Sequence, residues 1–262
     1  MDCNNDGMAI PINSDVVLTP PVPAATVMVL RDAPDGLQVL LMRRHAKSGV
    51  LGGVYVFPGG KLDAADRTGL PESLSCEQRH AALAEPDLDT ATALYRAAVR
   101  ETFEECGLRL DPASLWPWSR WITPRQPSVT NKRFDTRFFV APAPAGQHAV
   151  HDNHEATEAV WLAPAEGLRR YWEGDIDLAP PQIMSLSELH RLRTVQQALA
   201  LARGRAPALI EPEPFDEDGC RVICYPGDPR HRIAARVWPG PTRLTHRNQR
   251  FEPEGGLAAL LG

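Results

Sequence analysis

The sequence predicts an α/β fold, because short β-rich segments alternate along the chain with helical ones. The β-rich segments are bounded by Gly, Pro and charged residues, whereas the helical segments place apolar residues three and four positions apart. The predicted strands are 24–30, 38–43, 54–57, 115–123, 133–141 and 158–162, and the predicted helices are 94–108, 164–173 and 183–203.

Length and composition limit the classes of function. A chain of 262 residues is long enough to bury a core and to form one domain, with or without an appendage. Its formal net charge of −5 and isoelectric point near 5.9 argue against a nucleic-acid-binding surface. No apolar run approaches the roughly 20 residues that cross a bilayer, and no signal peptide is recognisable. We therefore expect a cytoplasmic protein with reduced thiols and without nucleic-acid or membrane partners.

The first part of the chain predicts a leader and a hairpin. Residues 1–20 are polar and are expected to form a flexible leader. The first two strands are joined by a turn at 32–36 and predict a β-hairpin. The third strand runs directly into Pro58, Gly59 and Gly60. Because glycine has no Cβ atom, Gly59 and Gly60 would let backbone amides approach a phosphate closely.

Residues 62–93 form an acidic excursion between this turn and the long helix. They contain seven acidic residues and two arginines, with Pro and Gly breaks, which is typical of a solvated segment. The excursion could be a lid beside the phosphate-binding turn or a neutral surface feature. A short helix is expected near 76–84, and Asp89 or Thr90 would cap the long helix.

The helix 94–108 carries the functional prediction. It places Glu101, Glu104 and Glu105 at i, i+3 and i+4, so three carboxylates share one face. Like charges repel, and a hard divalent ion such as Mg²⁺ or Mn²⁺ would balance them; a solvated acidic face is the alternative. Gly107 is placed to end the helix in the left-handed conformation. The opposite face has the spacing of a buried stripe and consists of Tyr95, Val99, Thr102, Phe103 and Cys106.

The string R-E-T-F-E-E-C-G-L, from Arg100 to Leu108, resembles the Nudix box. In that box a glycine and a spaced glutamate precede R-E-U-x-E-E-x-G-U, where U is bulky and apolar. Gly60 matches the opening glycine, and Thr102 replaces the first apolar residue. Fourteen positions usually separate the glycine from the arginine; here the separation is 40, so about 26 residues are inserted. Counting eight positions back from Arg100 puts Thr92 in place of the early glutamate.

An inserted box of this kind resembles the peroxisomal coenzyme A diphosphatase branch of the Nudix family. Further motifs match that branch: W-x-x-W-I-T-P at 118–124, R-F-D-T-x-F-F at 133–139 and P-P-Q at 180–182. An upstream coenzyme A signature matches only in part. It includes Arg44, and with Arg43 this residue supplies positive charge for a 3′-phosphate or a diphosphate; a solvated strand end is the alternative.

The resemblance implies an α/β/α sandwich with a mixed sheet over 21–206, followed by a C-terminal extension, 207–262. It implies Mg²⁺- or Mn²⁺-dependent hydrolysis of a nucleoside diphosphate linked to another moiety. Coenzyme A or acyl-coenzyme A, giving a phosphopantetheine product and adenosine 3′,5′-bisphosphate, is the leading substrate. The alternatives are ADP-ribose, NADH or another diphosphate, and a non-catalytic binding or regulatory module. A homodimer is compatible with either.

The resemblance also assigns roles to residues. Arg100 would orient a box glutamate through a bidentate ion pair. Glu155 or Glu158, in the acidic loop before Trp161, would complete the metal site or act as the base, and the six-residue spacing to Trp161 favours Glu155. The implied metal ligands are Glu101, Glu104 and Glu105.

The last part of the chain carries the weakest signals. Beyond residue 207 the composition shifts to Pro, Gly and charged residues. The segments 221–224 and 233–238 predict a small terminal hairpin. The tryptophans of the predicted strand 115–123 are expected in the core: Trp116, Trp118 and Trp121.

Overall fold

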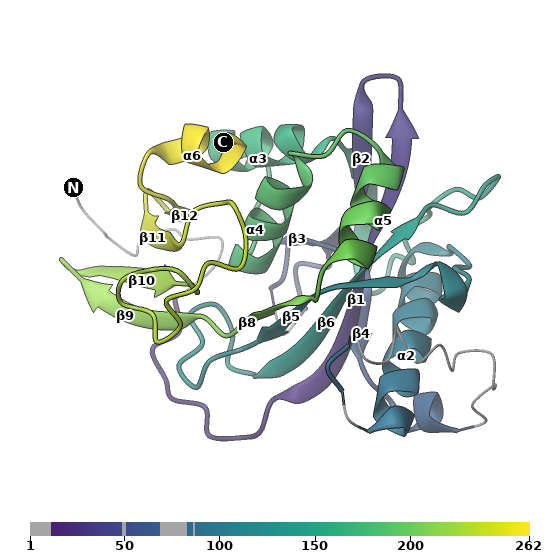
Figure 1. The fold of residues 1–262 in the computed structure, drawn as a ribbon, viewed down its shortest axis with the longest axis horizontal. Helices are drawn as coiled ribbons and strands as arrows, with labels where there is room; N and C mark the ends of the chain where they lie inside the picture. The colour runs from purple at the N-terminus through teal and green to yellow at the C-terminus, as the bar shows by residue number, and fades with distance from the viewer. Residues whose placement is uncertain (1–11, 49–50, 69–82, 86) are drawn as a thin grey trace.

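The computed structural model describes residues 12–48, 51–68, 83–85 and 87–262. These residues form an α/β/α sandwich, which confirms the predicted fold class (Figure 1). One face of the main sheet packs against α2 (Leu88–Cys106), and the other packs against α3 (Pro164–Glu173), α4 (Pro180–Leu189) and α5 (Val195–Gly204). The predicted helix near 76–84 lies almost entirely outside the described residues.

The main sheet has eight strands in the order β3-β2-β1-β6-β5-β8, with β4 paired to β1 and β7 paired to β2. Strand β1 is parallel to β6, and β5 is parallel to β8, whereas the other pairs are antiparallel, so the sheet is mixed as predicted. The strands are β1 Val22–Ala33, β2 Gly36–Arg44, β3 Tyr55–Val56, β4 Gly59–Lys61, β5 Trp116–Ile122, β6 Phe134–Pro142, β7 Ala156–Leu162 and β8 Ala208–Ile210.

Side chains along the central strands point alternately to the two faces of the main sheet, which explains why helices cover both faces. In β1, Val27 and Val29 pack against α2, whereas Met28 and Leu30 pack against the helices of the opposite layer. Successive side chains of a strand point to opposite faces, so a strand that is apolar at every position must be buried on both. The hairpin of β1 and β2 forms as predicted, with Ala33 paired to Gly36.

Helix α2 starts earlier than expected. The carboxylate of Asp87 accepts a hydrogen bond from the Thr90 backbone nitrogen at 3.1 Å, so Asp87 is the N-cap and the predicted caps Asp89 and Thr90 are wrong. Gly107 ends the helix with a φ of 72°, as predicted. The burial of Phe103 was predicted wrongly: it lies at the edge of the apolar face, under the guanidinium group of Arg109.

The predicted helix 183–203 is two helices, α4 and α5. The hydroxyl group of Thr194 accepts a hydrogen bond from the Gln197 backbone nitrogen at 3.2 Å and starts α5. An N-cap inside an apolar periodic pattern marks a new helix, and the leucine spacing hid it.

The C-terminal segment adds both to the main sheet and to a second sheet. Strand β8 is paired with β5, and a second, antiparallel sheet has the order β12-β11-β10-β9. Its strands are β9 Glu213–Glu217, β10 Cys220–Cys224, β11 Arg243–Arg247 and β12 Arg250–Glu252, and α6 (Gly256–Leu261) follows. The predicted pairing of 221–224 with 233–238 is wrong. Asp218 and Gly219 have positive φ and form the turn from β9 into β10, a hairpin signal that was overlooked.

The second sheet packs onto the main core. Trp121 of β5 stacks on Trp238 at 5.6 Å and contacts Tyr225 at 6.0 Å between ring centroids. Trp118 and Trp121 are buried and Trp116 is partly buried, in line with their predicted core position. Cys220 is in a disulfide bond, so the expectation of reduced thiols is wrong for this residue. None of the described helices is long and apolar enough to cross a bilayer.

Side chains tie the two ends of the acidic excursion to each other and to the sheet. Arg67 donates to the Thr90 hydroxyl at 2.8 Å, across the gap between η1 (Ala64–Arg67) and α2. Arg137 of β6, whose side chain is 3% exposed, pairs with Glu85 at 3.0 Å. These contacts hold the two ends of the excursion to each other and to β6.

Replacing Thr194 tests the N-cap that separates α4 from α5. Thr194→Ala should lower the free energy of unfolding by about 1 kcal/mol, because the Gln197 amide loses its acceptor. Thr194→Ser keeps the hydroxyl and should lose much less. Urea denaturation followed by circular dichroism measures both, and equal losses in the two variants would contradict the cap.

Candidate active site

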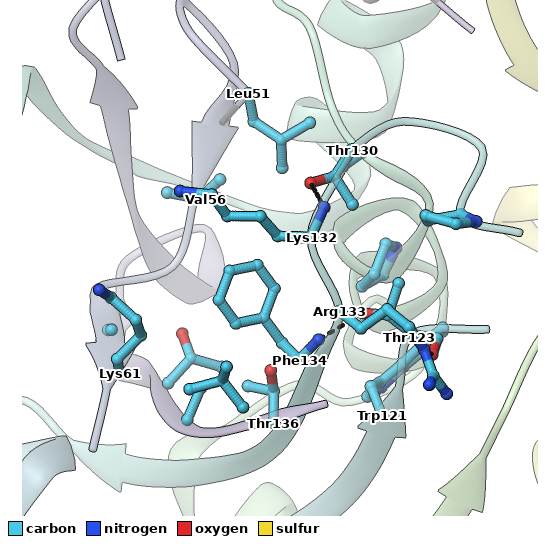
Figure 2. A pocket seen from close by; sticks show the side chains of 18 of the residues that line it. Leu51, Val56, Lys61, Trp121, Thr123, Thr130, Lys132, Arg133, Phe134 and Thr136 are labelled. Atoms are coloured by element: carbon cyan, nitrogen blue, oxygen red, sulfur yellow. Dashed lines mark hydrogen bonds between the residues drawn. The ribbon is translucent and has the colours of Figure 1, made fainter. Parts of the chain in front are cut away.

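A cleft of about 1040 Å³ lies where β4 and the Glu-rich end of α2 meet the loop 123–133. Figure 2 shows Lys61 and Trp121 on opposite sides of the view, with Phe134 and Thr136 between them. The cleft brings together most of the predicted site residues. Those that line it are Arg44, Gly59, Gly60, Arg100, Glu101, Glu104 and Glu155.

The glycines of β4 make room for carboxylates. The Gly59 backbone nitrogen donates to Oε2 of Glu105 at 3.0 Å, so this amide is already used within the protein. A Cβ atom on Gly60 would lie 2.4 Å from Oε1 of Glu101, and one on Gly59 would lie 2.4 Å from the Ala25 carbonyl oxygen. Both positions therefore require glycine. Their predicted contact with phosphate stays a prediction.

Arg100 is the centre of the charged network. Its Nε and Nη2 donate to the two carboxylate oxygens of Asp66, at 3.0 and 2.8 Å. Its Nη1 donates to Glu101 and to Glu104, each at 2.9 Å. The hydrogen bond with Asp66 is the main cause of the raised pKa of Arg100. Burial alone would raise the pKa of Asp66, but the bonds from Arg100 and from the Asp63 amide outweigh it and lower that pKa.

Asp66 is the site residue that sequence reasoning missed. It lies six positions after Gly60, and the usual box places its early glutamate six positions after the glycine, fourteen less eight. Counting back from Arg100 gives Thr92 instead, and that prediction is wrong. The Thr92 hydroxyl donates to the Leu88 carbonyl oxygen at 2.8 Å, within α2. The inserted residues therefore follow Asp66, and the forward spacing from the glycine was the available signal.

Glu105 is a buried carboxyl group. Its side chain is 4% exposed, and burial is the main cause that raises its pKa from 4.5 to about 8. The Gly59 amide and the charge of Arg44 act in the opposite direction, and the charges of Glu101 and Glu155 raise the pKa further. Burial also raises the pKa of Glu101, against the hydrogen bond from Arg100. A divalent cation would relieve this accumulation of negative charge.

The carboxylate side chains of the described residues are suitable ligands for a hard cation, but their positions do not form a metal site. Carboxylate oxygens are the ligands that Mg²⁺ and Mn²⁺ prefer. Within the part of the chain that the structure describes, however, no three acidic, His or Cys side chains are arranged to hold a metal ion. Glu101 and Glu104 share Nη1 of Arg100, and Glu105 is bound to Gly59. The ligand set Glu101, Glu104 and Glu105 therefore stays a prediction.

The structure separates the two candidate bases. Glu155 lines the cleft, and its charge acts on both Glu101 and Glu105. Its loop is shaped by Asp152, whose carboxylate accepts hydrogen bonds from three consecutive backbone nitrogens, those of 154–156. Glu158 accepts from the Tyr55 hydroxyl at 2.5 Å and does not line the cleft. Geometry thus favours Glu155.

The predicted cations separate too. Arg44 lines the cleft, whereas Arg43 does not; its guanidinium group lies 6.0 Å from the Tyr55 ring. Consecutive residues of a strand point to opposite faces, so the pair could not both reach the cleft. Lys61 and Lys132 line it and were not predicted to do so.

Comparison with known proteins finds related chains. A family model described as the NUDT19 Nudix domain matches residues 111–192, which begin after α2. The acyl-coenzyme A diphosphatase NUDT19 of Xenopus laevis is 25% identical over 58% of this chain and 59% of its own length. This chain thus spans less than two thirds of that relative. The protein of the same name from Gallus gallus is 25% identical over 75% of each chain.

A solved structure shares the fold. The NUDIX hydrolase from Alicyclobacillus acidocaldarius is 25% identical, covers 70% of this chain and 97% of its own, and superposes with a TM-score of 0.56.

Replacing Asp66 tests its role toward Arg100. Asp66→Asn should lower turnover by about 10- to 100-fold, because Arg100 loses the charge that fixes its orientation toward Glu101 and Glu104. Asp63→Asn is the matched control, since Asp63 is 65% exposed and 3.9 Å from Arg100. Equal effects of the two variants in a steady-state assay would contradict the role of Asp66.

Glu105 should make the stability of the metal-free protein depend on pH. Its folded pKa of about 8 exceeds its ordinary 4.5, so the folded state binds the proton more tightly. This contribution is complete below pH 4.5 and is lost as the pH rises through 8. Glu105→Gln stays neutral and keeps it. In EDTA, the melting temperature of Glu105→Gln should therefore rise relative to that of the wild type as the pH increases from 5 to 9. A difference in melting temperature that does not change with pH would contradict the raised pKa.

Proposed function

We propose that this chain, which resembles the NUDT19 branch of the Nudix family, is a hydrolase that cleaves coenzyme A or acyl-coenzyme A. The products would be adenosine 3′,5′-bisphosphate and a phosphopantetheine moiety. One observation carries the proposal: buried carboxylates organised by Arg100 lie at the edge of a cleft of about 1040 Å³. Ligand sites usually measure about 300–1,000 Å³, so this volume favours an extended substrate.

Each charged residue has a role in the proposed reaction. A bound Mg²⁺ or Mn²⁺ ion, held by Glu101, Glu104 and Glu105, would supply charge neutralisation of the diphosphate and a more acidic water. Arg100 orients Glu101 and Glu104, and the Gly59 amide fixes Glu105. Glu155 is exposed in the cleft and accepts the proton of the attacking water.

Cations of the cleft would meet the remaining phosphate charge. Arg44, Lys61 and Lys132 line it, and Lys61 and Lys132 form no ion pair with a described carboxylate. Two of the three lysines in the whole chain are thus in this cleft. They replace Arg43 in our assignment of the 3′-phosphate contacts.

The proposal is tested by a substrate panel read by mass spectrometry: coenzyme A, dephospho-coenzyme A, acyl-coenzyme A, ADP-ribose and NADH, each with Mg²⁺ or Mn²⁺. We expect adenosine 3′,5′-bisphosphate from coenzyme A or its thioesters and poor cleavage of dephospho-coenzyme A. Preferred cleavage of ADP-ribose or NADH would refute the substrate. Failure to cleave any member would favour a binding module.

Substitutions of three glutamates test the assignments within the site. Glu155→Gln should lower kcat by about a hundredfold or more, since it removes the base. Glu105→Gln should lower it at least as much. Glu158→Gln is the matched control, because Glu158 bonds Tyr55 outside the cleft, and it should retain near wild-type activity. A larger loss in Glu158→Gln than in Glu155→Gln would reverse the assignment of the base.

A further inference from the structure

The C-terminal segment forms one wall of the cleft. Four of its residues line the cleft: Pro212, Pro214, Ile223 and Tyr225. Pro214 of β9 is paired with Ile223 of β10, so two strands hold this wall in place. None of the four residues lies in the segment 111–192 that matches the Nudix model.

The apolar lining continues from this wall to the turn formed by Pro58, Gly59 and Gly60. Tyr225 contacts Trp121 at 6.0 Å, Trp121 contacts Phe138 at 6.0 Å, and Phe138 contacts Phe57 at 6.3 Å between ring centroids. All four aromatic residues line the cleft. Phe57 is two residues before Gly59, whose amide binds Glu105. A ligand with its diphosphate at the carboxylates could therefore extend an apolar part along this lining.

Charge distinguishes the C-terminal wall from the rest of the cleft lining. The lining residues of 212–225 are all uncharged. The cations and carboxylates that line the cleft come from other segments, among them Arg44, Lys61, Glu101 and Lys132. A 3′-phosphate or a second ribose phosphate would have no cation on the C-terminal wall, whereas a hydrocarbon chain would bury apolar surface there.

Two buried polar atoms along the cleft have no hydrogen-bond partner. They are Oη of Tyr225, which is 0% exposed, and Oε1 of Gln182, which is 7% exposed. A buried polar atom without a partner costs free energy, and a ligand that supplies the missing bond recovers it. A pantetheine arm carries amide groups, which can donate to Gln182 and accept from Tyr225.

We propose that the C-terminal wall, formed by Pro212, Pro214, Ile223 and Tyr225, binds the acyl-pantetheine arm of a coenzyme A thioester together with Gln182. The inference rests on the proposed function, since it takes a thioester of this kind as the substrate. It assigns the nucleotide to the charged part of the lining, which includes Arg44, Lys61 and Lys132, and the arm to the C-terminal wall. Acyl-chain preference is then set by residues of 212–225.

Pro214→Glu tests the wall, because it places a carboxylate among apolar residues at a half-buried position. The ratio of kcat/KM for dodecanoyl- to acetyl-coenzyme A should fall by about tenfold or more. Phe215→Glu adds the same charge to the same strand at a position that does not line the cleft, next to Arg230 and Arg243. It should leave the ratio as in the wild type. An unchanged ratio in Pro214→Glu overturns the inference.

Tyr225→Phe tests the unpartnered hydroxyl separately from packing. We expect KM for coenzyme A to rise about three- to tenfold, while the melting temperature of the free protein stays equal or increases. A hydroxyl without a ligand role would leave KM unchanged, which would overturn its assignment.

Inhibition by adenosine 3′,5′-bisphosphate, which lacks the arm, separates this inference from the proposed function. Its inhibition constant should be the same in the wild type and the three variants. Weaker inhibition in Pro214→Glu would place the nucleotide on the wall and overturn the inference. If the wild type cleaves no coenzyme A thioester, the proposed function fails; calorimetric binding of dodecanoyl-coenzyme A to wild type and Pro214→Glu then still decides the role of the wall.

Discussion

The ion pair between Arg100 and Asp66 is the interaction on which the site depends. One guanidinium group binds Asp66 with two parallel hydrogen bonds and still reaches two glutamates of α2 and the Lys61 carbonyl oxygen. It thereby joins η1, β4 and α2 at a single point. Without this cation, the carboxylates of that point would repel each other at short range in a partly dry environment. Glycine is required at position 60, the second residue of β4, because any side chain there would occupy the space of Glu101.

Local patterns predicted the elements but not their junctions. The strands of the hairpin, α3 and the left-handed end of α2 at Gly107 follow from periodicity and glycine chemistry. Strand β4 was missed because two of its three residues are glycines, which have little intrinsic preference for strands. Its pairing with β1 is enforced by the tertiary structure. The break between α4 and α5 was hidden because the leucine pattern continues across Thr194.

The site could be predicted where one helix carries it and not where the chain must fold to assemble it. Glu101, Glu104 and Glu105 share a face of α2 by spacing alone. The contributions of Asp66, Glu155 and the C-terminal wall arise from segments far apart in the sequence, so no local pattern reveals them. The choice between Glu155 and Glu158 depended on which of the two lines the cleft, and their spacing to Trp161 alone does not determine this.

Because both ends of the acidic excursion are held in place, its length can vary without moving the residues of the candidate site. Arg67, Thr90, Glu85 and Arg137 close the base of this segment as a stem closes a hairpin loop. The entropy of closing a loop grows only with the logarithm of its length, about 0.6 kcal/mol for each doubling. Insertions or deletions in this segment therefore cost little free energy while Asp66 and α2 keep their positions. An insertion in the excursion could therefore add a new binding surface next to the candidate site without changing the site itself.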